Sequence, residues 1–453
     1  MMPHKITREY IDNLQKLIEQ HDEKSVTTLV QTLHAADIAE VFNVLSMEEA
    51  KFLYMLLDGE KRGDVIIELE DDRREWFLKA LSGKEIARQF IEEMDSDDAA
   101  DVIGELSEEM QEEVLQHIKD VEQAGDIVDL LSYHEETAGG LMAKELIQVV
   151  ESWDIPICLR EMRKQAEDVD EVYFIYVVDE SGILKGTLSL KRLLLSSRSE
   201  KVADLYKSDI ISVKTDTHRE DVANIMRKYD LVALPVVDSI GRLLGRITID
   251  DVVDVMQEEA ERDFQLASGI TEDIEPSDNV FLLTRARLPW LFIGLLGGIL
   301  AALLLGGHED QLRLYPEMAF FIPLIAAMGG NVGVQSSAII VQGLASKSLI
   351  LESAGKKLMK ELIVAVMNGI TLSALALAYN LVQKESLALT LSVSSALFSV
   401  IIFASVFGTF IPLLLNRFKI DPALATGPFI TTMNDIISLF IYLMIGRMLY
   451  GII

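Results

Sequence analysis

Thr431-Thr432-Met433-Asn434-Asp435-Ile436-Ile437 lies within the last long apolar stretch of the chain and contains a single carboxylate, Asp435. A charge at membrane depth is costly unless water, a cation or hydrogen bonds compensate for it, so intramembrane acids commonly mark ion paths. The alternative is an internal ion pair. The nearest cation on this segment, Arg447, is twelve residues further on, which is about 18 Å along a helix. Asp435 is therefore our first candidate for a functional residue.

The same stretch is the last of several apolar segments that are long enough, at about 20 residues each, to cross a bilayer. Lys and Arg gather before the first segment, after the second and after the fourth. The positive-inside rule then predicts a cytoplasmic amino terminus and an external carboxyl terminus. We predict an all-α transmembrane domain over residues 285–453, in the cell (inner) membrane. Its five spans are placed near 287–306, 317–345, 359–383, 387–415 and 425–450.

Charge is divided unevenly along the 453-residue chain, whose formal net charge is −31. From Thr284 onward there are 8 acids and 11 bases, which leaves 64 of the 72 acids and 30 of the 41 bases in residues 1–283, a balance of −34. Such a surface repels nucleic acid and attracts cations, so we expect no nucleic-acid partner. The first residues lack the apolar core of a signal peptide, and the single Cys158 cannot form an internal disulfide. We therefore expect the acidic half to lie in the cytoplasm.

The front of the acidic half contains a repeated helical pattern. Asp37-Ile38-Ala39-Glu40-Val41-Phe42 returns 61 positions later as Asp98-Ala99-Ala100-Asp101-Val102-Ile103. Repeated amphipathic segments of this kind are typical of stacked helical hairpins. Ser46-Met47-Glu48-Glu49 has the spacing of a capping box and predicts that a helix begins there. We predict an acidic, all-α helical-repeat domain over residues 1–130.

A second repeat follows, in which Val178, Asp179, Gly182 and Gly186 each stand 59 positions before an identical residue. Each copy reads as a strand, an Asp/Gly turn, a second strand and then a helix. This pattern resembles a tandem pair of cystathionine-β-synthase (CBS) domains, an α/β fold that usually regulates its attached partner and often binds adenine nucleotides. We assign residues 131–262 to this pair. ATP is a candidate ligand, with no residues assigned to its binding.

An acidic connecting helix and linker, residues 250–284, overlap the end of the CBS pair. Asp250, Asp254 and Glu258 recur at i, i+4 spacing and share one helix face, where like charges repel. The ordinary interpretation of such a run is a solvated helix face. The alternative is a surface that binds divalent cations.

Polar and flexible residues interrupt two of the spans. Irregular or polar segments at membrane depth are tolerated where they are buried or line a water-filled cavity, although small residues also allow close helix packing. Asn331 and Gln335 share a helical face, and Thr431 and Thr432 are expected on the face of Asp435. The candidate pore or ion-binding residues are Asp435, Thr431, Thr432, Asn331, Gln335 and Gly427.

The donors in this set indicate which metal would bind. One carboxylate with neutral oxygen donors suits a hard cation such as Mg²⁺, which is often bound through its water shell. A softer metal prefers imidazole or thiolate, and none of the seven histidines lies within a predicted span. Met328 and Met433 could serve a soft ion, but methionine at such positions is usually a packing residue.

The chain has, in order, a helical repeat, a CBS-like pair, an acidic helix and five apolar spans with polar interruptions. In this arrangement it resembles the MgtE family of magnesium channels and transporters over nearly its full length. The resemblance implies a homodimer with a helical amino-terminal domain, a CBS pair, a connecting "plug" helix and five transmembrane helices per subunit around a pore at the dimer axis. It implies that Asp435 holds hydrated Mg²⁺ there. The matching segments are residues 136–142, residues 229–238, Gly329-Gly330-Asn331 with Gly333 and Gln335, Asp421-Pro422-Ala423, and Asp435.

The resemblance also implies a role for the excess acid. In the family, intracellular Mg²⁺ bridges acidic faces of the helical domain, the CBS pair and the plug helix, and this holds the pore closed. Cations would stabilise a compact arrangement that carboxylate repulsion disfavours, which is a population shift by differential binding. The matching regulatory positions are Asp95, Asp98, Asp230, Asp250, Asp251, Asp254, Glu258 and Glu259.

Two positions depart from the family pattern and leave alternatives open. The family commonly has a second amide where this chain has Val334, and Asn-Pro where it has Gly427-Pro428. We expect a Mg²⁺ channel or transporter for magnesium uptake and homeostasis, with no enzymatic step, since the chain lacks a Gly-Lys-Ser/Thr phosphate loop. The alternatives are transport of Mn²⁺ or Co²⁺, and a non-conducting, membrane-anchored sensor of Mg²⁺ or nucleotide.

Overall fold

The computed structural model of the chain describes residues 6–69, 71–166, 169, 172–272, 274, 279–345, 354–425 and 427–452. It divides into two compact units, residues 1–258 and residues 259–453. The division falls inside one uninterrupted helix, α14 (Ile249–Ser268).

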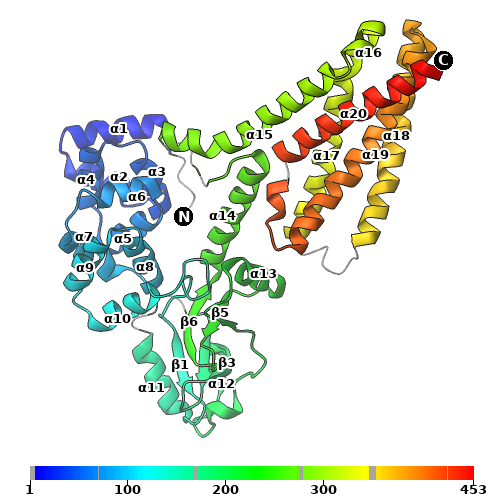
Figure 1. The fold of residues 1–453 in the computed structure, drawn as a ribbon. Helices are drawn as coiled ribbons and strands as arrows, with labels where there is room; N and C mark the ends of the chain where they lie inside the picture. The colour runs from blue at the N-terminus through cyan, green and yellow to red at the C-terminus, as the bar shows by residue number, and fades with distance from the viewer. Residues whose placement is uncertain are drawn as a thin grey trace. The chain divides into compact units, whose positions relative to one another are not determined.

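The first unit begins with short helices, drawn from blue to cyan in Figure 1. The two copies of the sequence repeat fall on α3 and α8, so the repeat does mark equivalent helices. The capping box at Ser46 is confirmed, because the Ser46 hydroxyl accepts the Glu49 N–H while the Glu49 carboxylate accepts the Ser46 N–H. The helices are α1 Arg8–Glu19, α2 Glu23–Val30, α3 Ala35–Phe42, α4 Met47–Met55, α5 Gly59–Ile67, α6 Asp71–Leu78, α7 Gly83–Gln89, η1 Ile91–Glu93, α8 Ser96–Gly104, α9 Glu108–His117 and α10 Val121–Leu130.

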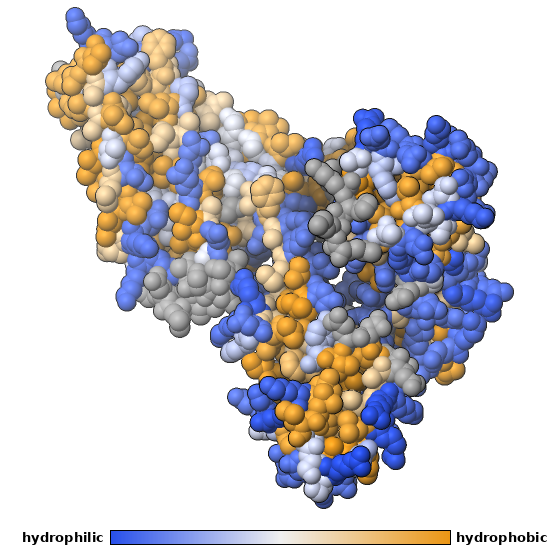
Figure 2. Space-filling model, turned by 180° about the vertical axis from the view of Figure 1, so that it is seen from behind, coloured by the Kyte–Doolittle hydropathy of each residue, from blue (hydrophilic) through white to orange (hydrophobic). Residues whose placement is uncertain are grey.

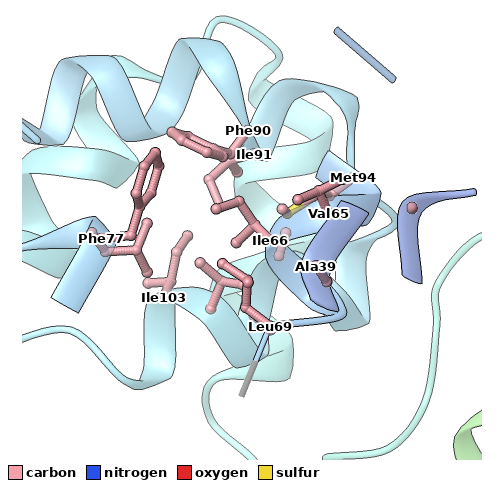
Figure 3. Close-up of a cluster of buried hydrophobic side chains, with 14 of the residues drawn as sticks. Ala39, Val65, Ile66, Leu69, Phe77, Phe90, Ile91, Met94 and Ile103 are labelled. Carbon is pink, nitrogen blue, oxygen red and sulfur yellow. The ribbon is translucent and has the colours of Figure 1, made fainter. Parts of the chain in front are cut away.

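Apolar side chains from successive helices meet between them. Figure 3 shows Phe77 and Phe90 facing Ile66 and Ile103 across this core. All four side chains are buried, and the Phe77 and Phe90 rings lie edge to face. Short helices are marginal alone and are stabilised by such tertiary packing.

Two three-stranded sheets follow, each with its first two strands parallel and its last two antiparallel. In each sheet the register shifts by one residue near the turn, at Val177/Val178 and at Val236/Val237. This duplication confirms the α/β pair predicted from the sequence repeat. The elements are β1 Ile147–Val150, α11 Ile155–Gln165, β2 Ile175–Val178, β3 Leu184–Leu188, α12 Leu190–Leu195, η2 Val202–Asp204, β4 Val213–Lys214, α13 Arg219–Tyr229, β5 Ala233–Val237 and β6 Leu243–Thr248.

The two hairpin turns are built alike and contact one another. Asp179 Oδ1 accepts the N–H groups of residues 181 and 183, and Asp238 Oδ1 accepts those of residues 240 and 242. Gly182 and Gly241 follow with φ of 82° and 91°, a region that favours glycine. The N–H of Leu184 donates to Gly241 O and that of Leu243 to Gly182 O, both at 3.0 Å. The reciprocal bonds relate the two halves by an approximate twofold axis.

Cys158, the lone cysteine, is fully buried beneath the first sheet. It lies on α11 and packs with Ile147 and Val149 of β1. Burial raises the pKa of its thiol to about 11. The thiol is therefore a packing group in this fold.

The second unit contains five helices long and apolar enough to cross a membrane among the residues that the structure describes. Four of these spans match the predicted ones within a few residues, whereas the first begins earlier, at Val280. The elements, green to red in Figure 1, are α15 Val280–Gly306, α16 Glu309–Leu314, η3 Pro316–Phe321, α17 Ile322–Ala345, α18 Ala354–Gln383, α19 Leu387–Arg417, η4 Pro422–Ala425 and α20 Pro428–Ile452.

The core of this unit is formed around α19. Val393, Val400 and Ile401 of α19 are fully buried together with Ile325 and Tyr442. The outer surface is largely apolar, as Figure 2 shows for one face. An apolar exterior with a packed interior is the arrangement that a lipid environment favours.

Candidate cation path and acidic cluster

A seam of glycines brings α17 close to α20 beside Asp435. A Cβ at Gly329 would lie 2.0 Å from Ser438 Oγ, and one at Gly333 would lie 1.8 Å from Asn434 Nδ2. A Cβ at Gly330 would lie 2.9 Å from Asp435 Oδ1. The side chains of α20 therefore occupy the space that the missing side chains of α17 leave free.

Polar atoms at this seam have few partners. Asp435 Oδ1 is buried and accepts no hydrogen bond from the described residues, and both amide atoms of fully buried Asn434 are likewise unsatisfied there. None of the described cations forms an ion pair with Asp435. Burying polar groups unsatisfied is costly. The described part of the chain therefore does not support the alternative that Asp435 forms an internal ion pair. Its unsatisfied oxygen could accept a hydrogen bond from the water of a hydrated cation, or bind the cation directly.

The other candidate pore residues divide into two groups. Asn331 and Gln335 are exposed on one face of α17 in the single chain. Thr431 also lies at the seam, with its methyl carbon 3.2 Å from the Cβ position of Gly330. Thr432 differs from the prediction, because its side chain packs against Gly297 of α15, where its methyl carbon lies 2.0 Å from the Cβ position. Residues three apart on a helix share a face only roughly, and α15 covers the side that Thr432 presents.

Gly427 has a structural role just before α20. Its φ is 55°, and a Cβ there would lie 2.2 Å from the carbonyl oxygen of Ala267, near the end of α14. The Gly427 carbonyl accepts the Thr431 N–H at 3.0 Å and the Thr431 hydroxyl at 2.9 Å. A larger side chain at this position would displace either α14 or the start of α20.

In the first unit, carboxylates gather where α8 begins. Carboxylate oxygens of Asp95, Asp97 and Glu145 all lie within 4.8 Å of one another, a spacing that could hold a metal ion. Ser96 fixes Glu145 in place, because its N–H donates to Oε1 at 3.1 Å and its hydroxyl to Oε2 at 2.8 Å. Asp251, at the start of α14, accepts the Thr248 N–H at 3.1 Å and hydroxyl at 2.7 Å.

The electrostatics of this acidic cluster disfavour the ionised forms. Burial first, and then the charges of neighbouring acids, raise the pKa of Asp98 to about 7 and that of Asp97 well above its ordinary value. Burial and Glu135 likewise raise the pKa of Asp101 to about 7. Burial also raises the pKa of Asp251, although the bonds from Thr248 act in the opposite direction. A bound cation would relieve this repulsion, since an opposite charge favours the ionised forms.

The predicted regulatory residues are brought together in part. The charges of Asp95, Asp250 and Asp251 all act on Asp98. The contacts of the described residues do not join Asp230 to them. Asp230 ends α13 in the left-handed conformation, with φ 51°. Asp254, further along α14, interacts electrostatically with Asp250 and Asp251. Its charge also acts on Glu68, and burial raises the pKa of both the Asp254 and the Glu68 carboxyls.

Three members of the acidic cluster, Asp97, Asp101 and Glu145, are absent from the regulatory positions predicted from the sequence. Asp97 stands within the segment that supplied Asp95 and Asp98, so its neighbourhood was a usable signal. Glu145 had no such signal, because it stands 47 positions beyond Asp98 and only the fold brings it to α8.

Glu258 lies on the acidic face of α14 but already contacts a protein cation. The Arg219 guanidinium lies 2.8 Å from Glu258 and 3.1 Å from Glu136, which precedes β1, the first strand of the CBS pair. The Arg219 side chain is only 18% exposed, so this bridge is partly shielded from solvent. Glu259, the next residue on α14, is partly buried.

Comparisons with known proteins agree with this architecture. A family model described as "Divalent cation transporter" (MgtE) matches residues 322–445, one described as "MgtE intracellular N domain" matches residues 33–136, and a CBS domain model matches residues 202–258. "Magnesium transporter MgtE" of Thermus thermophilus is 33% identical over 443 residues, covering 96% of this chain and 98% of the relative. The protein of the same description from Bacillus subtilis is 31% identical over 419 residues, covering 92% of each chain.

Among the solved structures, one matches the acidic half of this chain as follows. It is described as the crystal structure of the cytosolic domain of the Mg²⁺ channel MgtE in complex with ATP. It is 33% identical to this chain, covers 54% of this chain and 99% of its own, and has a TM-score of 0.51.

Proposed function

The chain belongs to the MgtE family of magnesium transporters, and from that premise we propose that it forms a Mg²⁺-selective path for magnesium uptake and homeostasis, closed by Mg²⁺ bound to its cytosolic domains. It is a transporter and not an enzyme. The observation that carries the proposal is the Asp435 carboxylate, which lies at the glycine seam of a membrane-spanning helix without a hydrogen-bond partner for Oδ1 among the described residues. A hydrated Mg²⁺ ion supplies both charge and donors to such a group.

Gating is proposed on the acidic cluster. With the cytosolic face depleted of Mg²⁺, repulsion among Asp95, Asp97, Asp98, Glu145 and Asp251 disfavours the compact arrangement of the first unit. Mg²⁺ has a higher affinity for the arrangement in which these acids converge than for one in which they are apart. Differential affinity of this kind shifts the population toward the compact state.

We further propose a homodimer with its soluble domains in the cytoplasm and its carboxyl terminus outside. The positive-inside distribution of Lys and Arg supports the orientation. Exposure of Asn331 and Gln335 in the single chain supports a second subunit, because such amides at membrane depth require protein or water around them.

Mg²⁺ influx into proteoliposomes tests the transport proposal. Influx is measured at low Mg²⁺ on the cytosolic face, with Mn²⁺ and Co²⁺ added as competitors. We expect Mg²⁺ influx that excess Co²⁺ reduces only weakly. Equal or faster flux of Mn²⁺ or Co²⁺ would assign the path to another divalent cation, and a dimer without flux would indicate a sensor.

Replacement of Arg219 should enlarge the Mg²⁺ response of the soluble half. Arg219→Gln removes the guanidinium that neutralises Glu136 and Glu258. A partly exposed ion pair contributes about 1 kcal/mol, so protease cleavage of the variant in EDTA should be about fivefold faster than that of the wild type. Millimolar Mg²⁺ should protect both proteins alike, because the metal replaces the guanidinium.

Arg242→Gln is the matched control. Arg242 pairs with Asp238 inside one hairpin turn, at 2.8 Å, and should leave the Mg²⁺ response unchanged. Equal cleavage of Arg219→Gln and wild type in EDTA would contradict a role for the bridge.

The CBS pair is proposed to bind ATP, on the likeness to the ATP-bound cytosolic domain. Titration calorimetry on the full chain should give one ATP per subunit, with no heat from inorganic phosphate at the same concentration. Absence of heat for ATP would leave the pair a structural element that transmits the Mg²⁺ signal.

A further inference from the structure

A second carboxylate lies inside the membrane-spanning helices, away from Asp435. Glu361 belongs to α18, within the span Gly355–Gln383. Its Oε1 accepts hydrogen bonds from Ser336 Oγ of α17 and Ser405 Oγ of α19, both at 2.6 Å. The two hydroxyl oxygens are 2.9 Å apart. One oxygen atom therefore joins three helices.

These contacts are short and shielded. Ser336 and Ser405 are 3% and 2% exposed. Hydroxyl-to-carboxylate bonds of about 2.5–2.7 Å are charge-assisted and about twice as strong as neutral ones. The nearby hydroxyls of Ser337 and Thr409 are buried without a partner among the described residues. Lys357, one turn before Glu361 on α18, is also buried.

The Glu361 cluster contacts the same stretch of α17 that forms the seam with Asp435. Ser336 follows Gly330 by six residues, about 9 Å along the helix. Between them, Gly333 touches both neighbours of α17. A Cβ at Gly408 of α19 would lie 2.4 Å from the Gly333 carbonyl oxygen, and Asn434 of α20 covers Gly333 from the other side.

We propose that Glu361 is a positioning residue for the cation path. Glu361 accepts hydrogen bonds from hydroxyls of α17 and α19, and it thereby fixes the height and the rotation of α17. This position of α17 sets Gly330 against Asp435 and directs Asn331 and Gln335 to the opposite, exposed face. The proposal rests on the proposed role of Asp435. It assigns to Glu361 an effect on how the path binds cations, beyond holding the helices together.

The experiment is Mg²⁺ influx into proteoliposomes as a function of Mg²⁺ concentration, together with the ratio of Mn²⁺ to Mg²⁺ flux. Glu361→Gln keeps the size and an acceptor oxygen but removes the charge, so each hydroxyl bond loses about half its strength. We expect the half-saturating Mg²⁺ concentration to rise about tenfold and the flux ratio to rise with it. Ser336→Ala and Ser405→Ala should each give a smaller change in the same direction. The double variant Ser336→Ala/Glu361→Gln should be no worse than Glu361→Gln alone, because both changes remove the same interaction.

Ser399→Ala is the matched control, since the Ser399 hydroxyl of α19 donates only within its own helix, to Ser395 O at 2.9 Å. It should behave as wild type. A lower yield or maximal rate of the Glu361 and serine variants, with half-saturation and flux ratio unchanged, would overturn the proposal and leave Glu361 a structural anchor. Flux in Asp435→Ala equal to that of the wild type would instead remove the proposed path itself, so the two failures are distinguishable.

Discussion

Asp435→Asn is expected to lower Mg²⁺ influx into proteoliposomes about a thousandfold, to the level of empty liposomes. The substitution keeps the shape of the side chain and removes its charge. At about 4 Å and an effective dielectric constant of about 20, one unit charge contributes about 4 kcal/mol to holding another, and twice the charge on Mg²⁺ raises this further. A loss of about 4 kcal/mol corresponds to a factor of about 1,000 in affinity.

The control for this variant is Asp310→Asn, which removes an exposed acid of the same type from α16. Its influx should equal that of the wild type. The soluble half of Asp435→Asn should still become resistant to protease when Mg²⁺ is added, since the acidic cluster is unchanged. If Asp435→Asn conducted at the wild-type rate, the carboxylate would have no part in the path.

The second large effect concerns pH and the acidic cluster. Folded-state pKa values of about 7 at Asp98 and Asp101, against an ordinary 3.8, mean that folding favours the protonated forms. The stability that protonation contributes is fully present below about pH 4 and is lost as pH rises through about 7. In EDTA, the unfolding temperature of the soluble half should therefore fall by about 5 °C or more between pH 5 and pH 8. Saturating Mg²⁺ at pH 8 should restore it, because the metal binds the ionised acids.

Asp98→Asn tests the origin of this effect. The variant cannot ionise at position 98, where burial and then the charges of Asp251, Asp95, Asp101 and Asp250 raise the pKa of the native carboxyl. Its unfolding temperature in EDTA should therefore change less with pH and should exceed that of the wild type at pH 8. Asp216→Asn, at an exposed acid between β4 and α13, should titrate as the wild type does. A wild-type pH profile in Asp98→Asn would show that repulsion in the acidic cluster does not set the stability of the compact state.

Local patterns predicted most of the fold. Apolar length located the five spans, the Asp/Gly spacing located both hairpins, and Ser46 with Glu49 located a helix start. Each of these signals lies within one contiguous stretch of the sequence. They required no knowledge of which helix faces would meet.

The site depended on those faces, and there the sequence was insufficient. In the sequence, Glu361 contributed only to the count of acids. Its proposed role became visible only in the structure, where hydroxyls of α17 and α19 donate to it. Glu145 joins the acidic cluster through Ser96, and Arg219 reaches Glu258 across 39 positions. Thr432 was assigned to the face of Asp435 because helix spacing alone could not show that Gly297 of α15 would receive it.

The burial of Cys158 has a practical consequence. A thiol with no solvent exposure and a pKa of about 11 reacts negligibly with maleimides near neutral pH. The native chain can therefore serve directly as the unreactive background for site-directed labelling, without prior cysteine removal. A cysteine placed at position 331 or 335 would be the only fast-reacting thiol in the folded protein, and its rate of modification from either side of the bilayer would report when that face is open to water.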